Sequence, residues 1–280
     1  MTEAEGADWV PAGVDRATPS VARIYDYLLG GAYNLAADRA VARRLTDIQP
    51  EVALVARRNR AFLRRAVKFM LDAGIRQFLD LGSGIPTTGN VHEVAQAVDP
   101  AARIVYVDYE SVAVAHSRLL LADNPYAATV QADITRPADV LDSGPVRTLL
   151  DLTQPVGLLA VAVGHYLPPA ADVPRVFATY RDALAPGSQL ALTHLTNDFA
   201  VLADPRVAET MRATQDHIFP RPRAEVLELF QGFELVEPGL TTSGNWHPER
   251  LTAAVLPQDD GLYAGLGIRR RDARIGTPAR

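Results

Sequence analysis

The chain has 280 residues, of which 48 % are hydrophobic and 22 % are charged, and its formal net charge is −5. This composition is typical of a globular protein and gives no general attraction to nucleic acid or to anionic membranes. Because the sequence contains no cysteine, disulfides, a thiol nucleophile and cysteine-held zinc or iron–sulfur clusters are excluded, and we predict no metal site.

The sequence predicts neither a membrane span nor a secretory signal. No window approaches the roughly 18 uncharged apolar residues that a spanning helix needs. The N-terminal stretch MTEAEGADWVPAG is acidic and lacks an apolar core. We therefore expect a cytoplasmic protein with no membrane partner.

Three helices are expected before the first strand, after a disordered tail over residues 1–17. Thr18-Pro19 supplies a capping hydroxyl and a proline suited to the first helical turn, and Gly30-Gly31 ends that helix. We predict that residues 18–74 form a helical cap or lid, with Tyr25 and Gly30 at the mouth of a cofactor site. The alternative is an amphipathic helix that only packs on the sheet. The helices are expected over residues 18–29, 34–49 and 51–73.

From residue 75 onward, short apolar runs alternate with helical segments. Continuous apolar runs indicate strands buried on both faces, and helices between them indicate a parallel α/β sheet. A late pair of runs predicts a closing strand pair with one antiparallel member. We place this domain at residues 75–268, followed by a polar tail over 269–280. The expected strands are residues 77–81, 103–108, 129–132, 157–163, 189–194, 233–237 and 262–268.

The stretch FLDLGSGIPTTGN predicts a ligand-binding turn between the first strand and the next helix. Gly82, Ser83 and Gly84 allow a tight turn and close approach of a ligand to the backbone. A dinucleotide site would need a third glycine, where Thr87 stands, so a pyrophosphate ligand is disfavoured. A nucleoside cofactor without phosphate, S-adenosylmethionine, fits better. Asp80 is then placed to bind the ammonium group of that cofactor.

Acidic residues follow the next two strands. Asp108, with Tyr109 beside it, ends the second strand and is suited to the two ribose hydroxyls. Asp133 and Ile134 follow the third strand and are assigned to the adenine amino group and ring. Since ligands bind at the carboxyl edge of open α/β sheets, these residues are expected at one site. In the alternative, Asp108 only caps a helix and Asp133 only starts a turn.

The acceptor is expected beyond the ends of the fourth and fifth strands. His165 and Tyr166 follow the fourth strand, and His194 ends the fifth. Histidine titrates near neutrality, so we predict that these three residues orient the acceptor or remove its proton. The alternative is that the histidines only hydrogen-bond neighbouring loops and that His194 stays buried on its strand.

Several motifs together resemble a known family. The order DLGSG, YVDYE and ADITRP resembles class I S-adenosylmethionine-dependent methyltransferases. The stretches PSVARIYDYLLGGAYNLAADRA, DLGSGIPTTGNVHEVAQ, YRDALAPGSQLALTHL, GFELVEPGL and NWHPE resemble an actinobacterial methyltransferase-like family long catalogued without a function. This resemblance covers about residues 18–268. It implies a Rossmann-like, seven-stranded, mostly parallel sheet with helices on both faces and a helical N-terminal extension, but no substrate.

Three functions remain open at this stage. The first is methyl transfer to a small-molecule acceptor, and the second is a non-catalytic S-adenosylmethionine-binding regulator. The third is an NAD(P)-dependent oxidoreductase, which is disfavoured because the only lysine, Lys68, excludes a downstream Tyr-x-x-x-Lys pair. The segment GHYLPP differs from the Asn-Pro-Pro-Tyr signature of enzymes that methylate amino groups of DNA or protein, which disfavours these substrates, nucleic acid included, without excluding them. The oligomeric state is left open.

Overall fold

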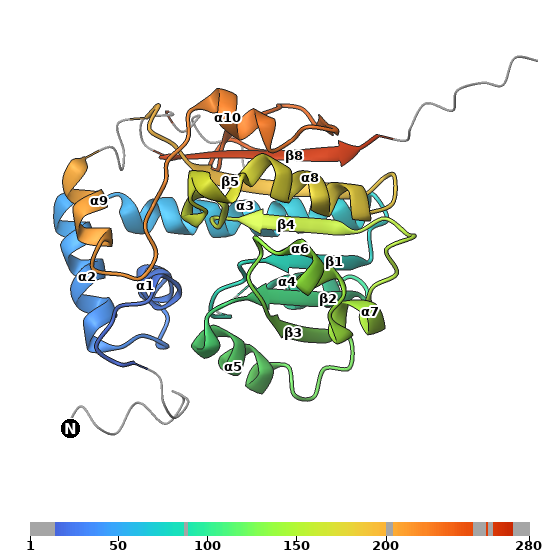
Figure 1. Cartoon of the computed structure of the whole chain (residues 1–280), viewed down its shortest axis with the longest axis horizontal. Helices are drawn as coiled ribbons and strands as arrows, with labels where there is room; N and C mark the ends of the chain where they lie inside the picture. The colour runs from blue at the N-terminus through green and yellow to red at the C-terminus, as the bar shows by residue number, and fades with distance from the viewer. Residues whose placement is uncertain (1–14, 87–88, 200–203, 249–255, 257–259, 271–280) are drawn as a thin grey trace, which may run out of the picture.

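The structure is a computed structural model that describes residues 15–86, 89–199, 204–248, 256 and 260–270 (Figure 1). The predicted tails therefore lie almost wholly outside the described residues, as does Thr87. The described strands are β1 (Gln77–Leu81), β2 (Arg103–Asp108), β3 (Ala127–Gln131), β4 (Gly157–Val161), β5 (Gln189–Leu195), β6 (Phe233–Leu235), β7 (Thr241–Thr242) and β8 (Leu262–Arg269). The helices are α1 (Val21–Leu28), α2 (Ala36–Ile48), α3 (Val52–Asp72), α4 (Val91–Gln96), α5 (Ser111–Leu120), α6 (Pro137–Leu141), α7 (Gly144–Leu149), α8 (Val173–Ala183), α9 (Pro205–Met211) and α10 (Arg223–Glu228).

The sheet has the order β3-β2-β1-β4-β5-β8-β6, which confirms the predicted α/β fold. Strands β1 to β5 are mutually parallel, and β8 runs antiparallel to both β5 and β6. The sequence had predicted seven strands, whereas the structure adds the two-residue β7, which pairs with β8. Because the order reverses between β1 and β4, a crevice opens at the carboxyl ends of these strands, where such sheets bind ligands.

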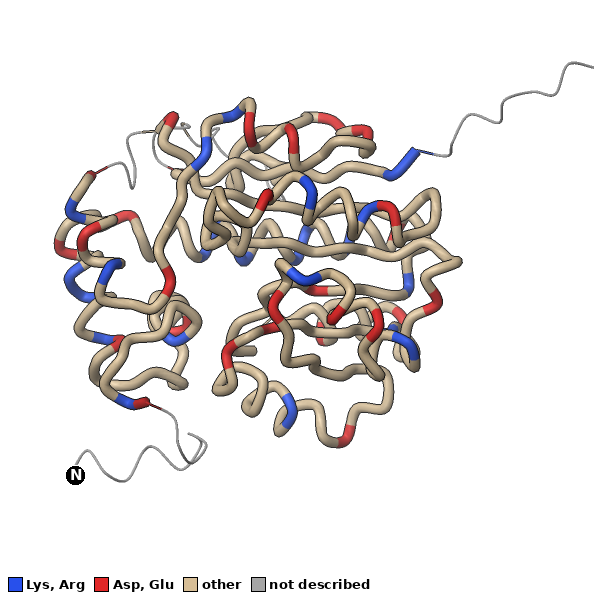
Figure 2. The backbone as a smooth tube through the Cα atoms, viewed as in Figure 1, with Lys and Arg blue, Asp and Glu red and all other residues tan. Residues whose placement is uncertain are grey.

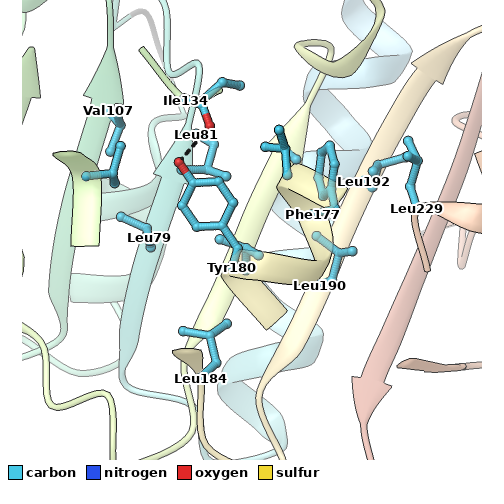
Figure 3. Packing of buried hydrophobic residues seen from close by; sticks show 14 of the residues in the cluster. Leu79, Leu81, Val107, Ile134, Phe177, Tyr180, Leu184, Leu190, Leu192 and Leu229 are labelled. Atoms are coloured by element: carbon cyan, nitrogen blue, oxygen red, sulfur yellow. Dashed lines mark hydrogen bonds between the residues drawn. The ribbon is translucent and has the colours of Figure 1, made fainter. Parts of the chain in front are cut away.

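Both faces of the central strands are buried. Every residue of β1 and β5 is buried, as expected for parallel strands covered by helices. On one face, Tyr180 of α8 packs with leucines of β1 and β5 and donates its hydroxyl to the carbonyl of Ile134 at 3.0 Å (Figure 3). This bond links the core to the loop after β3, so packing in the core positions part of the strand edge.

Helix α3 covers the opposite face of the sheet. Its residues Phe62, Val67 and Met70 are fully buried against the strands, and Phe62 makes an edge-on contact with Trp246. Two groups of Arg65 hold the carbonyls of Ser243 and Trp246, at 2.6 and 2.9 Å. The long third helix is therefore part of the sheet's own core.

Helices α1 and α2 form a smaller core with α9 beside the carboxyl ends of the strands (Figure 1). The fully buried carboxylate of Asp38 holds this unit together: it accepts the backbone N–H groups of Ser20 and Leu35 and pairs with Arg23 at 2.7 Å. Ser20, rather than Thr18, caps α1, because its hydroxyl accepts the N–H of Arg23. Within the described chain, no helix has the length and apolar character of a membrane span.

Candidate functional site

A cavity of about 560 Å³ lies at the carboxyl ends of β1, β2, β3 and β4. The loops after these strands form its floor and sides, and α1 and α3 close it with Ala22, Tyr25, Asn59 and Arg60. Its volume falls in the range of about 300–1,000 Å³ that is usual for small-molecule sites. The cavity therefore occupies the crevice that the strand order creates.

The glycine turn forms one wall of the cavity. Gly82 and Gly84 have φ angles of +68° and +64°, which glycine adopts without steric cost. The N–H groups of Gly82 and Ser83 both donate to the carbonyl of Val107, at 2.8 and 3.1 Å, and fix the turn against β2. The hydroxyl of Ser83 is buried and has no hydrogen-bond partner within the described residues. A ligand with a polar group at this wall would satisfy it.

Two of the predicted carboxylates lie next to this turn. Asp108 accepts the N–H of Gly84 at 2.7 Å and that of Glu110 at 2.9 Å, so it positions both loops. Burial raises the pKa of Asp108, and these backbone hydrogen bonds oppose the rise. Burial also raises the pKa of Asp80 to about 7; the charge of Arg60 opposes this shift and that of Asp108 adds to it. An ionised Asp80 is thus favoured when a cation binds beside it.

The loop after β3 supplies the two residues that were predicted to bind the adenine. Asp133 and Ile134 both line the cavity, and Ile134 is buried. One oxygen of Asp133 accepts the N–H and hydroxyl of Thr135, both at 2.8 Å. This is the local turn that the alternative interpretation predicted, but the second carboxylate oxygen makes no hydrogen bond within the described chain. Asp133 can therefore stabilise the turn and also accept a hydrogen bond from a ligand.

Polar contacts join the loop after β2 to α1 and to the segment after α9, across the cavity mouth. The carboxylate of Glu110 accepts the hydroxyl of Ser20 at 2.6 Å and lies 3.3 Å from Arg23. Burial raises the pKa of Glu110 to about 7, although the hydrogen bond to Ser20 and the charge of Arg23 oppose this. The half-exposed Tyr109 donates its hydroxyl to Asp216, which also lines the cavity. These contacts hold α1 and the segment after α9 over the cavity.

A chain of hydrogen bonds runs behind the cavity wall. Asn59 donates to the hydroxyl of Tyr25 at 2.9 Å and accepts that of Thr193 at 2.7 Å. Thr193 in turn accepts the N–H of Ala162 at 2.8 Å. Ala162 has a φ of +58°, a costly conformation for a non-glycine residue, which this network holds in place. The strained residue ends β4 two residues earlier than predicted.

Because β4 ends early, the side chains of Tyr166 and His165 have different surroundings. A 3₁₀ turn over Gly164–Tyr166 places Tyr166 in the cavity wall and His165 outside the wall. His165 is buried, and its Nδ1 accepts the N–H of Leu195 at 3.3 Å. Burial, assisted by the charges of His194 and Arg221, lowers the pKa of His165 well below its usual range. His165 is therefore neutral and hydrogen-bonded to protein.

His194 also lies outside the cavity lining, on β5, which continues to Leu195. Its Nδ1–H donates to the carbonyl of Leu195 at 2.7 Å, and its Nε2 accepts from Arg221 at 2.9 Å. Burial lowers the pKa of His194 to about 4. Gly30, the remaining predicted residue, is exposed and only ends α1, with a φ of +85°. None of His165, His194 and Gly30 therefore lines this cavity.

Several cavity residues escaped sequence reasoning. Arg60, on the third helix, lines the cavity and donates to Asn90 at 2.7 Å. The helical spacing of Ala56, Asn59 and Leu63 marks the buried face beside which it lies. Asp216 follows α9 in a loop with no periodic signal, and only the tertiary structure brings it to the site.

The lining is strongly acidic. Figure 2 shows where Asp and Glu (red) and Lys and Arg (blue) lie along the backbone. One guanidinium, Arg60, faces a group of carboxylates from five positions: Asp80, Asp108, Glu110, Asp133 and Asp216. An acidic lining favours a cationic ligand and disfavours the pyrophosphate of a nicotinamide cofactor. The strand order, the glycine turn and the strand-end acids meet at one cavity, as the predicted nucleoside site requires.

Comparison with known proteins identifies the family. A family model described as S-adenosyl methyltransferase matches residues 7–270, and the chain belongs to this family. Its cofactor is S-adenosyl-L-methionine. No curated protein matches the chain.

Two solved structures are similar to the chain over nearly their whole length. One, from Thermobifida fusca YX and provisionally described as a methyltransferase, is 41 % identical, with a TM-score of 0.87, and the match covers 94 % of this chain and all of that one. The other is a DUF574 family protein from Streptomyces avermitilis MA-4680 that is 37 % identical, with a TM-score of 0.86. That match covers 91 % of this chain and 99 % of the other. The predicted resemblance is therefore confirmed.

Proposed function

We propose that the protein is an enzyme that transfers a methyl group from S-adenosylmethionine to a small-molecule acceptor. The observation that carries this proposal is one cavity in which the glycine turn and the three predicted carboxylates meet Tyr166 and α1. An acidic cavity of this volume suits a small acceptor better than a nucleic acid.

The chain's own residues fit the cofactor. Asp80 and Arg60 carry the charges that the ammonium and carboxylate of its methionine end require. We assign Asp108 to the ribose hydroxyls, and Asp133 and Ile134 to the adenine, since all three residues line the cavity. The orphaned hydroxyl of Ser83 supplies one further polar contact at the glycine turn.

When bound, S-adenosylmethionine would supply a methyl group on a cationic sulfur for transfer to a nucleophilic acceptor. The protein's contribution is then to position the acceptor in line and to exclude water. Tyr166 is the remaining predicted acceptor-side residue in the cavity wall, and its hydroxyl has no hydrogen-bond partner within the described chain. We assign it to orienting the acceptor, whose proton leaves to solvent.

One observation favours a second function, a non-catalytic cofactor-binding regulator. Both predicted histidine bases are buried, neutral and bonded to protein groups. Methyl transfer to an acceptor that must first lose a proton would therefore lack an evident histidine base. The regulator would bind the cofactor equally well but would transfer no methyl group.

Two measurements test these functions. Calorimetry with S-adenosylmethionine, S-adenosylhomocysteine and NAD tests binding, with Asp108→Asn as the variant and the exposed Asp142→Asn as its matched control. We expect both adenosyl compounds to bind wild type and the control, and Asp108→Asn to bind them at least tenfold more weakly, a loss of about 1.4 kcal/mol. Binding of NAD without binding of either adenosyl compound would refute the assignment of the cofactor.

A second experiment separates the enzyme from the regulator. The protein is incubated with labelled S-adenosylmethionine and cell extract, and only the enzyme should transfer the labelled methyl group to an acceptor.

A further inference from the structure

A second cavity of about 100 Å³ adjoins the first, underneath the helical cap. Side chains of α1, α2, α3 and α9 and the ends of β5 and β8 line it. Four residues line both cavities: Val21, Tyr25, Ala162 and Tyr166. We call the smaller cavity the acceptor chamber and these four residues the partition. Because the partition is shared, the chamber differs from an isolated packing void.

The lining of the acceptor chamber contains no acidic or basic side chain apart from His165. That histidine is neutral, since burial and the neighbouring Arg221 lower its pKa, and its Nδ1 already accepts the N–H of Leu195. The hydroxyl of Tyr25 is also engaged, donating to the carbonyl of Ala56 at 3.1 Å. A charged ligand group would find no counter-charge here, and burying it unpaired would cost several kcal/mol.

Polar chemistry in the chamber is therefore concentrated at the partition. Tyr166 presents a hydroxyl that has no hydrogen-bond partner within the described chain, and it borders the cofactor cavity as well. Small apolar cavities stay dry and accept apolar rings; one of about 150 Å³ binds benzene. At about 100 Å³ the chamber is smaller than that cavity, so it suits a short alkyl group or one small ring whose polar end reaches Tyr166 at the partition.

We propose that the acceptor chamber holds the apolar body of an uncharged methyl acceptor, a phenol-like or alkyl alcohol, with its polar group at Tyr166. This inference rests on the proposed function, since it places the acceptor beside the bound cofactor. It deepens that function by excluding acceptors whose body carries a charge.

Three small probes, tested on protein saturated with S-adenosylhomocysteine, show whether the chamber excludes charged ligands. They are p-cresol, 4-hydroxybenzoate and tyramine, which share a phenol ring and are neutral, anionic and cationic. By ligand-observed NMR we expect p-cresol to bind at least about tenfold more tightly than either charged probe, because an unpaired buried charge costs at least that factor. Equal binding of all three probes, or no saturable binding of p-cresol, would overturn the proposal.

Filling the chamber tests the location. Ala56→Leu adds side-chain volume to its lining, whereas Ala42→Leu, the matched control, makes the same change in the neighbouring small core outside the lining. We expect Ala56→Leu to weaken p-cresol binding about tenfold, a readily measured loss, and the control to leave it within about twofold. Both should keep wild-type affinity for S-adenosylhomocysteine, because neither residue lines the cofactor cavity. Unchanged p-cresol binding in Ala56→Leu contradicts the proposal.

Further variants and measurements separate a folding defect from a loss of probe binding. If Ala56→Leu does not fold, Met211→Phe fills the chamber from α9 and carries the same expectation. Tyr166→Phe should weaken p-cresol binding without changing thermal stability, since its hydroxyl has no protein partner within the described chain. Failure of S-adenosylhomocysteine to bind wild type would refute the proposed function, whereas normal cofactor binding with no probe selectivity would refute only the chamber assignment.

Discussion

Gly82 is a position at which a single added methyl group should be strongly destabilising. A Cβ built there would lie 2.2 Å from Cγ2 of Val163 and 2.7 Å from its Cβ. The φ of +68° also costs an L-residue about 1–2 kcal/mol. Overpacking typically adds about 1–3 kcal/mol. We therefore expect Gly82→Ala to destabilise the fold by about 2–5 kcal/mol and to displace the turn from the cofactor.

Gly84→Ala is the matched control for this prediction. Its φ of +64° is nearly the same, but its nearest neighbour would be Cβ of Ala22 at 3.9 Å, an ordinary contact. Only the conformational cost of about 1–2 kcal/mol should remain. Adding Val163→Ala to Gly82→Ala removes the 2.2 Å contact but leaves the one at 2.7 Å, so it should restore part of the lost stability.

Urea unfolding followed by circular dichroism measures these differences, and calorimetry with S-adenosylhomocysteine measures the effect on the site. Gly82→Ala should be less stable than Gly84→Ala by about 1–3 kcal/mol. Equal stabilities for the two variants would refute the steric reasoning, as would the absence of any rescue by Val163→Ala.

Three further predictions concern charged groups. The folded-state pKa of Asp80 is raised to about 7, so the stability that protonated Asp80 gives the ligand-free protein is lost as the pH rises from about 4 through 7. Asp80→Asn should remove this pH-dependent loss, which urea unfolding at several pH values measures. The same variant should also weaken cofactor binding. Because the pKa of His194 is lowered to about 4, stability should fall as the pH drops from about 6.5 to 4, and His194→Gln should flatten that slope. Asp38→Asn removes the closer and fully buried of the two charge partners of Arg23 and leaves Glu110 at 3.3 Å, so it should cost up to about 3–5 kcal/mol. Arg147→Ala, which breaks an exposed ion pair with Asp142, should have no measurable effect, and equal losses would contradict the argument.

The parallel sheet and the acids at its carboxyl edge were predictable from the amino-acid sequence. β1 and β2 lie at the predicted residues, because continuous apolar runs between helical segments have few alternatives in a parallel sheet. The cavity brings together Asp80, Asp108 and Asp133 because the carboxyl ends of parallel strands share one edge. Local pattern and topology were sufficient for these features.

The side of the cavity proposed for the acceptor depends on contacts that form only in the folded chain. The backbone of Ala162 is held in the left-handed region by a hydrogen-bond chain that reaches α3, and this ends β4 early and turns His165 away from the cavity while Tyr166 lines it. Arg60 and Asp216 reach the same space from a helix and a loop far away in the chain. Such placements depend on contacts between segments distant in sequence, so no local pattern of residues encodes them.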